Sequence, residues 1–281
     1  MSLVITGLVA LGVALVGLAL FYPYPESFPG LPRLTHTASG VAGDPINLVL
    51  IGDQAQITQS FRQAGWLVPD PITPQTTARI AAASLSHQPY PTAPVSPLYV
   101  FGRPQDLAFE KPTSDVQNRG HIRLWLTGTR LGGQEVWIAQ VSYDQGIELS
   151  ASTHFPTHHI APAVDREREA AGADLEHTGL VTSTALTAFA PPTLYARNGG
   201  GDFYASDGDA LVINFTSAAV SLAPPAPVIA GLKARVFLLY DALVSLPLWA
   251  LAALALAVAL LGAILLARRA RRSPVSRVAR G

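Results

Sequence analysis

The chain has 281 residues and no formal net charge, and 49% of its residues are hydrophobic while only 14% are charged. This composition is too apolar for an ordinary soluble domain. The zero net charge argues against a general nucleic-acid-binding protein. The absence of cysteine excludes thiolate catalysis and cysteine-ligated metals.

The apolar excess lies at the two ends of the chain. Residues 3–22 and residues 243–267 are uncharged runs, each with the roughly twenty residues that a bilayer core requires. The first run has no basic residue before it and ends without a small-x-small cleavage site, which favours a retained anchor over a cleaved signal peptide. The sequence therefore predicts one N-terminal and one C-terminal transmembrane helix.

The arginines set the expected orientation. Six arginines lie in residues 268–281, and such an excess is typical of the cytoplasmic side of a membrane. We therefore expect an inner (cytoplasmic) membrane protein with two spans, both termini cytoplasmic and the central domain extracytoplasmic. A nucleic-acid-binding tail is the competing interpretation, but the position of the arginines directly after an apolar run favours anchoring.

The composition shifts along the chain divide it into six expected segments. Two of them are rich in proline, glycine and small residues and are expected to be linkers. The segments are an anchor (1–23), a linker (24–45), an extracytoplasmic domain (46–216), a second linker (217–240), a transmembrane helix (241–267) and a basic cytoplasmic tail (268–281).

The central domain begins with one strand signal and two helix signals. Residues 46–52 form a short apolar run typical of a buried strand. Asp53 suits the N-cap of a following helix, and Gly65 suits its end. A second helix is expected from Pro74, since proline suits the first helical position, to about Ser86.

Strands dominate the middle of the chain. Residues 121–126 alternate, which places Ile122, Leu124 and Leu126 on one side of a sheet and His121, Arg123 and Trp125 on the other. Glycines 132 and 133 suit a turn into a partner strand, and residues 144–150 look like a further hairpin. One helix is expected from Pro162 to about His177. The histidines before it are expected on its entry loop, because Pro156 lies between His154 and His158, and several strands follow the helix. The pattern predicts an α+β fold with a largely antiparallel sheet and about three helices, flanked by the two transmembrane helices.

Five blocks of sequence, in order, carry a resemblance to a known family: 101–111, 119–126, 137–149, 157–169 and 203–215. Over roughly residues 44–216 the chain resembles the LssY C-terminal domain, which occurs in bacterial membrane proteins, sometimes fused to a phosphatidic-acid-phosphatase-like module. The Ser-Gly-His motif of that module is absent from the sequence, so its chemistry is not implied. Gly120 departs from the pattern, since a further basic residue or histidine is expected there.

The resemblance implies an envelope-associated domain with a shared set of polar residues. Residues 153–171 hold three histidines and a run of alternating charges. Two of these histidines, but not His154, belong to the set, together with one aspartate and one arginine of the charged run. The set, which holds the candidate catalytic residues, consists of His121, Arg123, Asp144, His158, His159, Asp165 and Arg168.

Three interpretations of this set stay open. In a metal site, His158 or His159 would join His121 and Asp144 across the sheet. In a hydrolytic site, one of these two histidines would act as base on a water molecule, and arginines would bind a phosphate or carboxylate. In the third interpretation, which we favour, the set is a buried structural network in which Arg168 pairs with Asp165 or Asp144, because a buried charge requires a partner.

The expected function follows from the absence of any specific catalytic motif. The sequence predicts an accessory or assembly subunit of a bacterial membrane or envelope complex, with the lipid bilayer and other membrane-protein subunits as partners and no nucleic acid. The alternative is a hydrolase that acts on a phosphorylated envelope substrate through a His/Asp/Arg site, with or without the assistance of a metal ion. The sequence identifies no cofactor and no particular metal.

Overall fold

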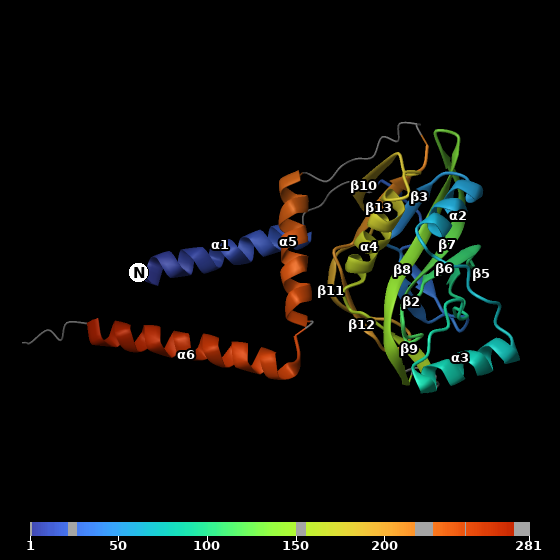
Figure 1. Cartoon of the computed structure of the whole chain (residues 1–281). Coiled ribbons are helices and arrows are strands. Elements are labelled where there is room, and N and C mark those ends of the chain that lie inside the picture. Colours follow the sequence, from blue (N-terminus) through green and yellow to red (C-terminus); the bar gives the residue numbers. More distant parts are fainter. Residues whose placement is uncertain (1, 22–26, 150–155, 217–226, 245, 273–281) are drawn as a thin grey trace, which may run out of the picture. The chain divides into compact units, whose positions relative to one another are not determined.

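A computed structural model describes residues 2–21, 27–149, 156–216, 227–244 and 246–272. The chain divides into two compact units, residues 1–237 and residues 238–281, and the folded domain lies in the first. The boundaries of the six segments expected from the sequence stay a prediction. Figure 1 shows the strands of this domain with the helices α2, α3 and α4.

Six helices occur in the described ranges, where the sequence predicted about three in the domain and two flanking it. They are α1 (Ser2–Phe21), α2 (Gln54–Gln63), α3 (Pro74–Ser86), α4 (Val164–Glu176), α5 (Pro227–Val244) and α6 (Leu248–Arg272).

Within the described residues, no helix combines the length and the apolar character needed to cross a membrane. The two predicted transmembrane helices are therefore wrong, and so is the two-span inner-membrane location with an extracytoplasmic domain. For the C-terminal run the structure shows one reason. Residues 243–267 do not form a single helix, because α5 ends at Val244, Pro247 precedes α6, and α6 continues into charged residues as far as Arg272. The apolar composition of a segment does not reveal whether the segment forms one continuous helix.

The main sheet has seven strands and is antiparallel except for one parallel pair. Its order is β10-β13-β3-β8-β7-β6, with β9 paired to β8, and β13 runs parallel to β3. The strands are β3 (Leu48–Ile51), β6 (Leu107–Lys111), β7 (Asn118–Leu131), β8 (Gln134–Leu149), β9 (Pro156–Ile160), β10 (Ser183–Ala188) and β13 (Asp209–Asn214).

Two smaller sheets complete the strand pairing. The first has the order β2-β1-β4-β5 and the second pairs β11 with β12. Their strands are β1 (Leu34–His36), β2 (Ala42–Pro45), β4 (Tyr99–Val100), β5 (Arg103–Pro104), β11 (Thr193–Arg197) and β12 (Phe203–Ser206).

The alternation of β7 divides its side chains between two regions of the core. Ile122 and Leu124 lie in one hydrophobic cluster, to which α2 contributes Phe61 and α4 contributes Leu175. Trp125 lies in a second cluster. The predicted alternation of β7 is therefore confirmed, and His121 and Arg123 share the face of Trp125 rather than the face that the helices cover.

The ends of α2 and α3 also match the sequence signals. Asp53 caps α2 by accepting from the backbone N–H of Gln56, and the Gln56 side chain accepts from the Asp53 backbone N–H in return. Pro74 occupies the first turn of α3, and Gly65 follows α2 with φ of 79°. Such reciprocal caps satisfy N–H groups that the helix leaves without partners.

Two local predictions near the histidines are wrong. Residues 144–149 do not form a hairpin of their own, because β8 continues to Leu149 through an irregularity between Asp144 and Ile147, and residue 150 lies outside the described residues. Residues 156–160 are not a loop but the strand β9. Pro156 is its first residue, where a missing N–H costs little, and the backbone of His158 pairs with that of Ile147.

Candidate functional site

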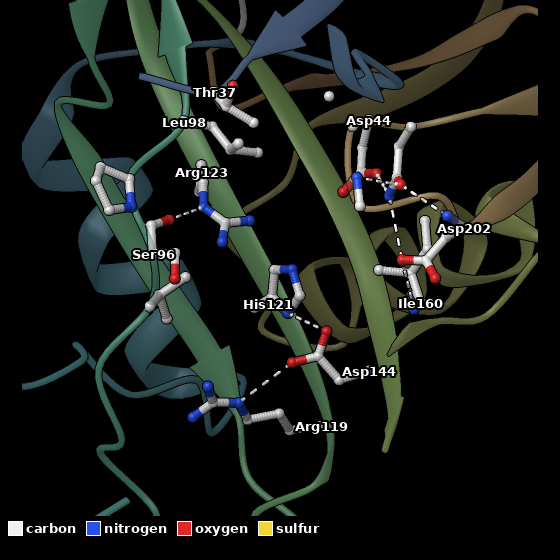
Figure 2. Close-up of a pocket in the computed structure, with 16 residues that line it drawn as sticks. Thr37, Asp44, Ser96, Leu98, Arg119, His121, Arg123, Asp144, Ile160 and Asp202 are labelled. Atoms are coloured by element: carbon white, nitrogen blue, oxygen red, sulfur yellow. Dashed lines mark hydrogen bonds and ion pairs between the residues drawn. The ribbon is translucent and has the colours of Figure 1, made fainter. Parts of the chain in front are cut away.

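A cavity of about 260 Å³ lies between β7, the strand β2 and the loop that connects β11 to β12. Figure 2 shows Arg119, His121 and Arg123 on one side of this cavity and Asp44 and Asp202 on the other. Apolar side chains from Val95, Pro97, Leu98 and Ile160 complete its walls. The cavity therefore joins charged groups of both signs within partly apolar walls.

The basic side of the cavity follows directly from the strand period of β7. Arg119, His121 and Arg123 are spaced by two residues, so their side chains leave the same face of the strand. All three are buried, with 3%, 5% and 5% of their surface exposed. A single strand thus delivers three basic groups to one wall.

Arg123 has a buried guanidinium group without a carboxylate partner. Its Nε donates to the Ser96 carbonyl oxygen at 2.9 Å, and its Nη1 donates to Gln140 Oε1 at 2.9 Å. Among the described residues, no group accepts a hydrogen bond from Arg123 Nη2 and none forms an ion pair with the side chain. Burial lowers the pKa of Arg123 to about 10, although Asp44 and Asp144 oppose this effect. The group stays protonated at neutral pH.

His121 lies between two side chains of β8. Ser142 Oγ is 3.0 Å from His121 Nε2, and Asp144 Oδ1 is 3.2 Å from His121 Nδ1. This order of hydroxyl, imidazole and carboxylate can orient a histidine for proton transfer. Ser142, however, is fully buried, and its Oγ also accepts from Gln140 Nε2 at 2.8 Å.

Arg119 is held by acidic groups on both neighbouring strands. Its Nη1 donates to Glu110 Oε2 at 2.5 Å, and its Nε lies 3.6 Å from Asp144 Oδ2. Burial raises the pKa of Glu110 to about 8, and this effect exceeds the opposing attraction of Arg119. Unlike Arg123, Arg119 already has two carboxyl groups of the protein, those of Glu110 and Asp144, as partners.

The acidic side of the cavity comes from β2 and from the loop before β12. Asp44 Oδ1 accepts from Asn198 Nδ2 at 2.9 Å. Asp202 lies 2.6 Å from His159 Nδ1, and its Oδ2 accepts from the backbone N–H of Ile160 at 3.3 Å. His159 therefore reaches the site through Asp202 rather than by lining the cavity itself.

Two of the predicted site residues lie elsewhere, in a separate buried network. Arg168 on α4 donates from Nη1 to Asp165 Oδ1 at 3.2 Å and makes two hydrogen bonds to Asp207, of 2.8 and 3.1 Å. Burial opposes the charge of Arg168, but Asp207 and Asp165 raise its pKa. Burial, reinforced by Asp207, raises the pKa of Asp165 to about 7. This network joins α4 to the turn between β12 and β13.

The structure thus separates the predicted set into groups. His121, Arg123 and Asp144 line the cavity, His159 contacts it through Asp202, and Asp165 and Arg168 belong to the α4 network. His158 has only its backbone described, and His154 lies outside the described residues. Among the residues whose side chains the structure describes, no three His, Asp or Glu side chains lie close enough together to bind a metal ion.

Gly120, where the family pattern leads us to expect a basic residue or histidine, occupies a space with no room for a side chain. A Cβ atom at this position would contact Glu167 Oε1 and would lie 3.3 Å from the ring of Trp66. A larger residue therefore requires these neighbours to move. The departure from the pattern is accommodated by the local packing and removes no group from the cavity, which lies on the other face of β7.

Several residues that line the cavity were not predicted from the sequence as site residues. Arg119 extends the two-residue period of His121 and Arg123 by one step, and this period could have identified it. Asp44 stood at the edge of an expected linker. Asp202 directly follows three glycines in the connection between two paired strands, and two of these glycines, Gly199 and Gly200, also line the cavity.

The comparisons with known proteins agree with the predicted resemblance. A family model described as LssY C-terminus matches residues 28–210, which is more than half of the chain. The match is consistent with the bacterial envelope-associated domain that the resemblance implies. No curated protein and no solved structure shows a significant match to the chain.

Proposed function

The chain belongs to the LssY C-terminus family, and we propose that its domain binds a small anionic ligand in the cavity beside β7. The observation that carries this proposal is the buried guanidinium of Arg123, which lines the cavity and forms no ion pair with any described residue. The bound group would be a phosphate or a carboxylate, since both accept hydrogen bonds from arginine in a planar arrangement.

The energetics of buried charge support this assignment. A charge removed from water is costly unless it is paired and hydrogen-bonded. The two protein acceptors of Arg123 are neutral oxygens, from Ser96 and Gln140. An anion at Nη2 would supply the missing countercharge inside a partly apolar cavity, where electrostatic attraction is stronger than in water.

A second candidate function is hydrolysis of a phosphorylated substrate bound at this site. The positions of Ser142 and Asp144 on either side of His121 favour it, because a histidine oriented by a carboxylate can act as a general base. The base would activate a water molecule. This candidate predicts phosphate release from p-nitrophenyl phosphate by the wild-type chain and its loss in His121→Gln, with phosphate binding retained.

The accessory or assembly role predicted from the sequence is a different kind of function. It requires exposed surfaces that recognise other protein subunits, and the cavity offers no support for it. This role and the predicted protein partners stay predictions. Co-purification of the chain with other envelope subunits in mild detergent would support them.

Isothermal titration calorimetry with inorganic phosphate and with acetate tests the anion site. The wild-type chain is expected to bind at least one of the two anions. Arg123→Gln should weaken that binding by about ten-fold or more, because a hydrogen bond to a charged group contributes about 1.5–3 kcal/mol. Arg130→Gln is the matched control, since Arg130 lies on the exposed β7–β8 hairpin, and it should bind as the wild type does. Equal affinities in all three proteins would contradict the proposal.

A further inference from the structure

The cavity holds a second buried charged group, opposite in sign to Arg123, that forms no ion pair with a described residue. Asp44 is 6% exposed, and its hydrogen bonds come from the neutral amides of Asn198, at 2.9 Å, and Gln140, at 3.3 Å. Within the described part of the chain, no cation forms an ion pair with Asp44. Burial raises the pKa of Asp44, with the Asn198 hydrogen bond opposing this effect.

Gln140 keeps these two charges apart. Its Oε1 accepts from Arg123 Nη1 at 2.9 Å, while its Nε2 donates to Asp44 Oδ2 at 3.3 Å. Gln140 is fully buried, so its amide is fixed between the two groups. Arg123 and Asp44 therefore each form a hydrogen bond to the neutral Gln140 side chain and no direct ion pair with each other. Both charged groups remain available to a ligand.

The other acids of the cavity already have charged or basic partners. Asp144 lies near Arg119 and His121, and Asp202 lies against His159. Arg119 is likewise paired with Glu110. Arg123 and Asp44 are therefore distinguished from the remaining charges of the cavity by their purely neutral partners.

We propose that the ligand is a small zwitterion, with an ammonium group at Asp44 and a phosphate or carboxylate at Arg123. This inference rests on the proposed anion-binding function and specifies its ligand class. A cavity of about 260 Å³ accommodates a molecule of a few heavy atoms rather than a large one. Only a ligand that carries both charges compensates both buried groups at once.

The competing ligand classes satisfy the cavity less well. A neutral ligand leaves both Arg123 and Asp44 without a charged group in direct contact, which retains much of the cost of burying them. A simple anion compensates Arg123 but adds negative charge near Asp44, Asp144 and Asp202, all of which line the cavity, and like charges repel at this range.

Calorimetry on the full chain with two matched ligands tests the inference. O-phosphoethanolamine and ethyl phosphate share the phosphate ester and differ in the ammonium group. The wild-type chain is expected to bind O-phosphoethanolamine about ten-fold more tightly or better, because one charge-assisted hydrogen bond accounts for such a factor. Asp44→Asn should abolish this preference and leave the binding of ethyl phosphate intact or stronger. Asp106→Asn, a change at an exposed ion pair, should preserve the preference.

The outcomes separate this inference from the proposed function. Equal binding of the two phosphate esters by the wild-type chain would overturn the zwitterion and leave the anion site standing. Failure to bind any anion would overturn both. The comparison of the two phosphate esters uses the wild-type chain alone, so it decides the question even if Asp44→Asn does not fold. Binding of β-alanine in place of O-phosphoethanolamine would support the zwitterion and identify its anionic group as a carboxylate.

Discussion

Arg123 and Arg168 are both buried arginines, yet their surroundings differ in a way that separates a site from a structural link. Arg168 contacts the carboxylates of Asp165 and Asp207, so its charge is compensated inside the protein. Arg123 contacts only neutral oxygens of Ser96 and Gln140. The first arrangement stabilises the fold, and the second leaves a charge available to a ligand.

This difference predicts unequal effects on stability when each arginine is replaced by methionine. Arg168→Met leaves two buried carboxylates without their cation and should lower the free energy of unfolding by about 3–5 kcal/mol. Arg123→Met leaves only neutral acceptors without a donor and should lower it by about 1–3 kcal/mol. Urea denaturation of the ligand-free variants measures both values. An Arg123→Met variant that is the less stable of the two would contradict the distinction.

The strand β7 shows how much of the site the sequence could predict. Its alternation placed His121 and Arg123 on one face, as observed, because the strand period of two is a local property. The acidic side of the cavity could not be predicted in this way. Asp44 and Asp202 are separated from β7 by many residues, and their approach depends on the pairing of β2 and on the β11–β12 loop, which no local pattern specifies.

The strand β9 shows the limit of composition as a guide to secondary structure. The proline and the adjacent histidines of residues 156–160 suggested a loop, but the segment is a strand because β8 is long enough to pair with it. Tertiary pairing overrides local preference in strands more readily than in helices. The helices α2 and α3, whose capping residues are local signals, were predicted with nearly their observed ends.

The turn between β12 and β13 carries the next prediction. Gly208 has φ of +77°, and a Cβ atom there would lie 2.8 Å from the Pro192 nitrogen. Gly133, in the β7–β8 turn, has φ of +82° with open space around it. Both alanine variants incur the backbone strain of about 1–2 kcal/mol, but Gly208→Ala also incurs the overpacking cost of about 1–3 kcal/mol. Thermal unfolding should show the larger loss for Gly208→Ala, and equal losses would contradict the packing described for this turn.

At the scale of the whole molecule, two buried acids, Glu110 and Asp165, and the half-buried Glu167 should make stability depend on pH. Burial raises the pKa of Glu110 to about 8 and the pKa values of Asp165 and Glu167 to about 7. The folded chain then holds protons that the unfolded chain releases near pH 4–5. The contribution of these three acids to the free energy of unfolding is fully present below pH 4–5 and is lost as pH rises to about 8. Asp207, whose pKa is lowered by Arg168 despite its burial, acts in the opposite direction only below about pH 4.

Chemical denaturation at pH 5 and at pH 8 measures this dependence. The wild-type chain should be more stable at pH 5, and Glu110→Gln should reduce the difference because its side chain does not titrate. A wild-type chain that is more stable at pH 8, or a Glu110→Gln variant with an unchanged difference, would show that these carboxyl groups are ionised in the folded state.

The apolar ends of the chain mark the largest disagreement between sequence and structure at this scale. The length and hydropathy of residues 3–22 and 243–267 predicted two spans, whereas none of the helices in the described ranges meets the requirements for crossing a membrane. Composition reports how apolar a segment is, but not where its helices end. The break between α5 and α6 near Pro247 is a feature that a count of apolar residues does not register.

The central claim is that Arg123 holds an anion in the cavity beside β7, and a crystal soaked with selenate tests it most directly. Selenate has the shape and charge of sulfate or phosphate, and its selenium atom is located by anomalous scattering. The account predicts an anomalous peak whose oxygen atoms lie within hydrogen-bond distance of Arg123 Nη2. An empty cavity in which the Arg123 guanidinium instead forms an ion pair with Asp44 or Asp144 would contradict it.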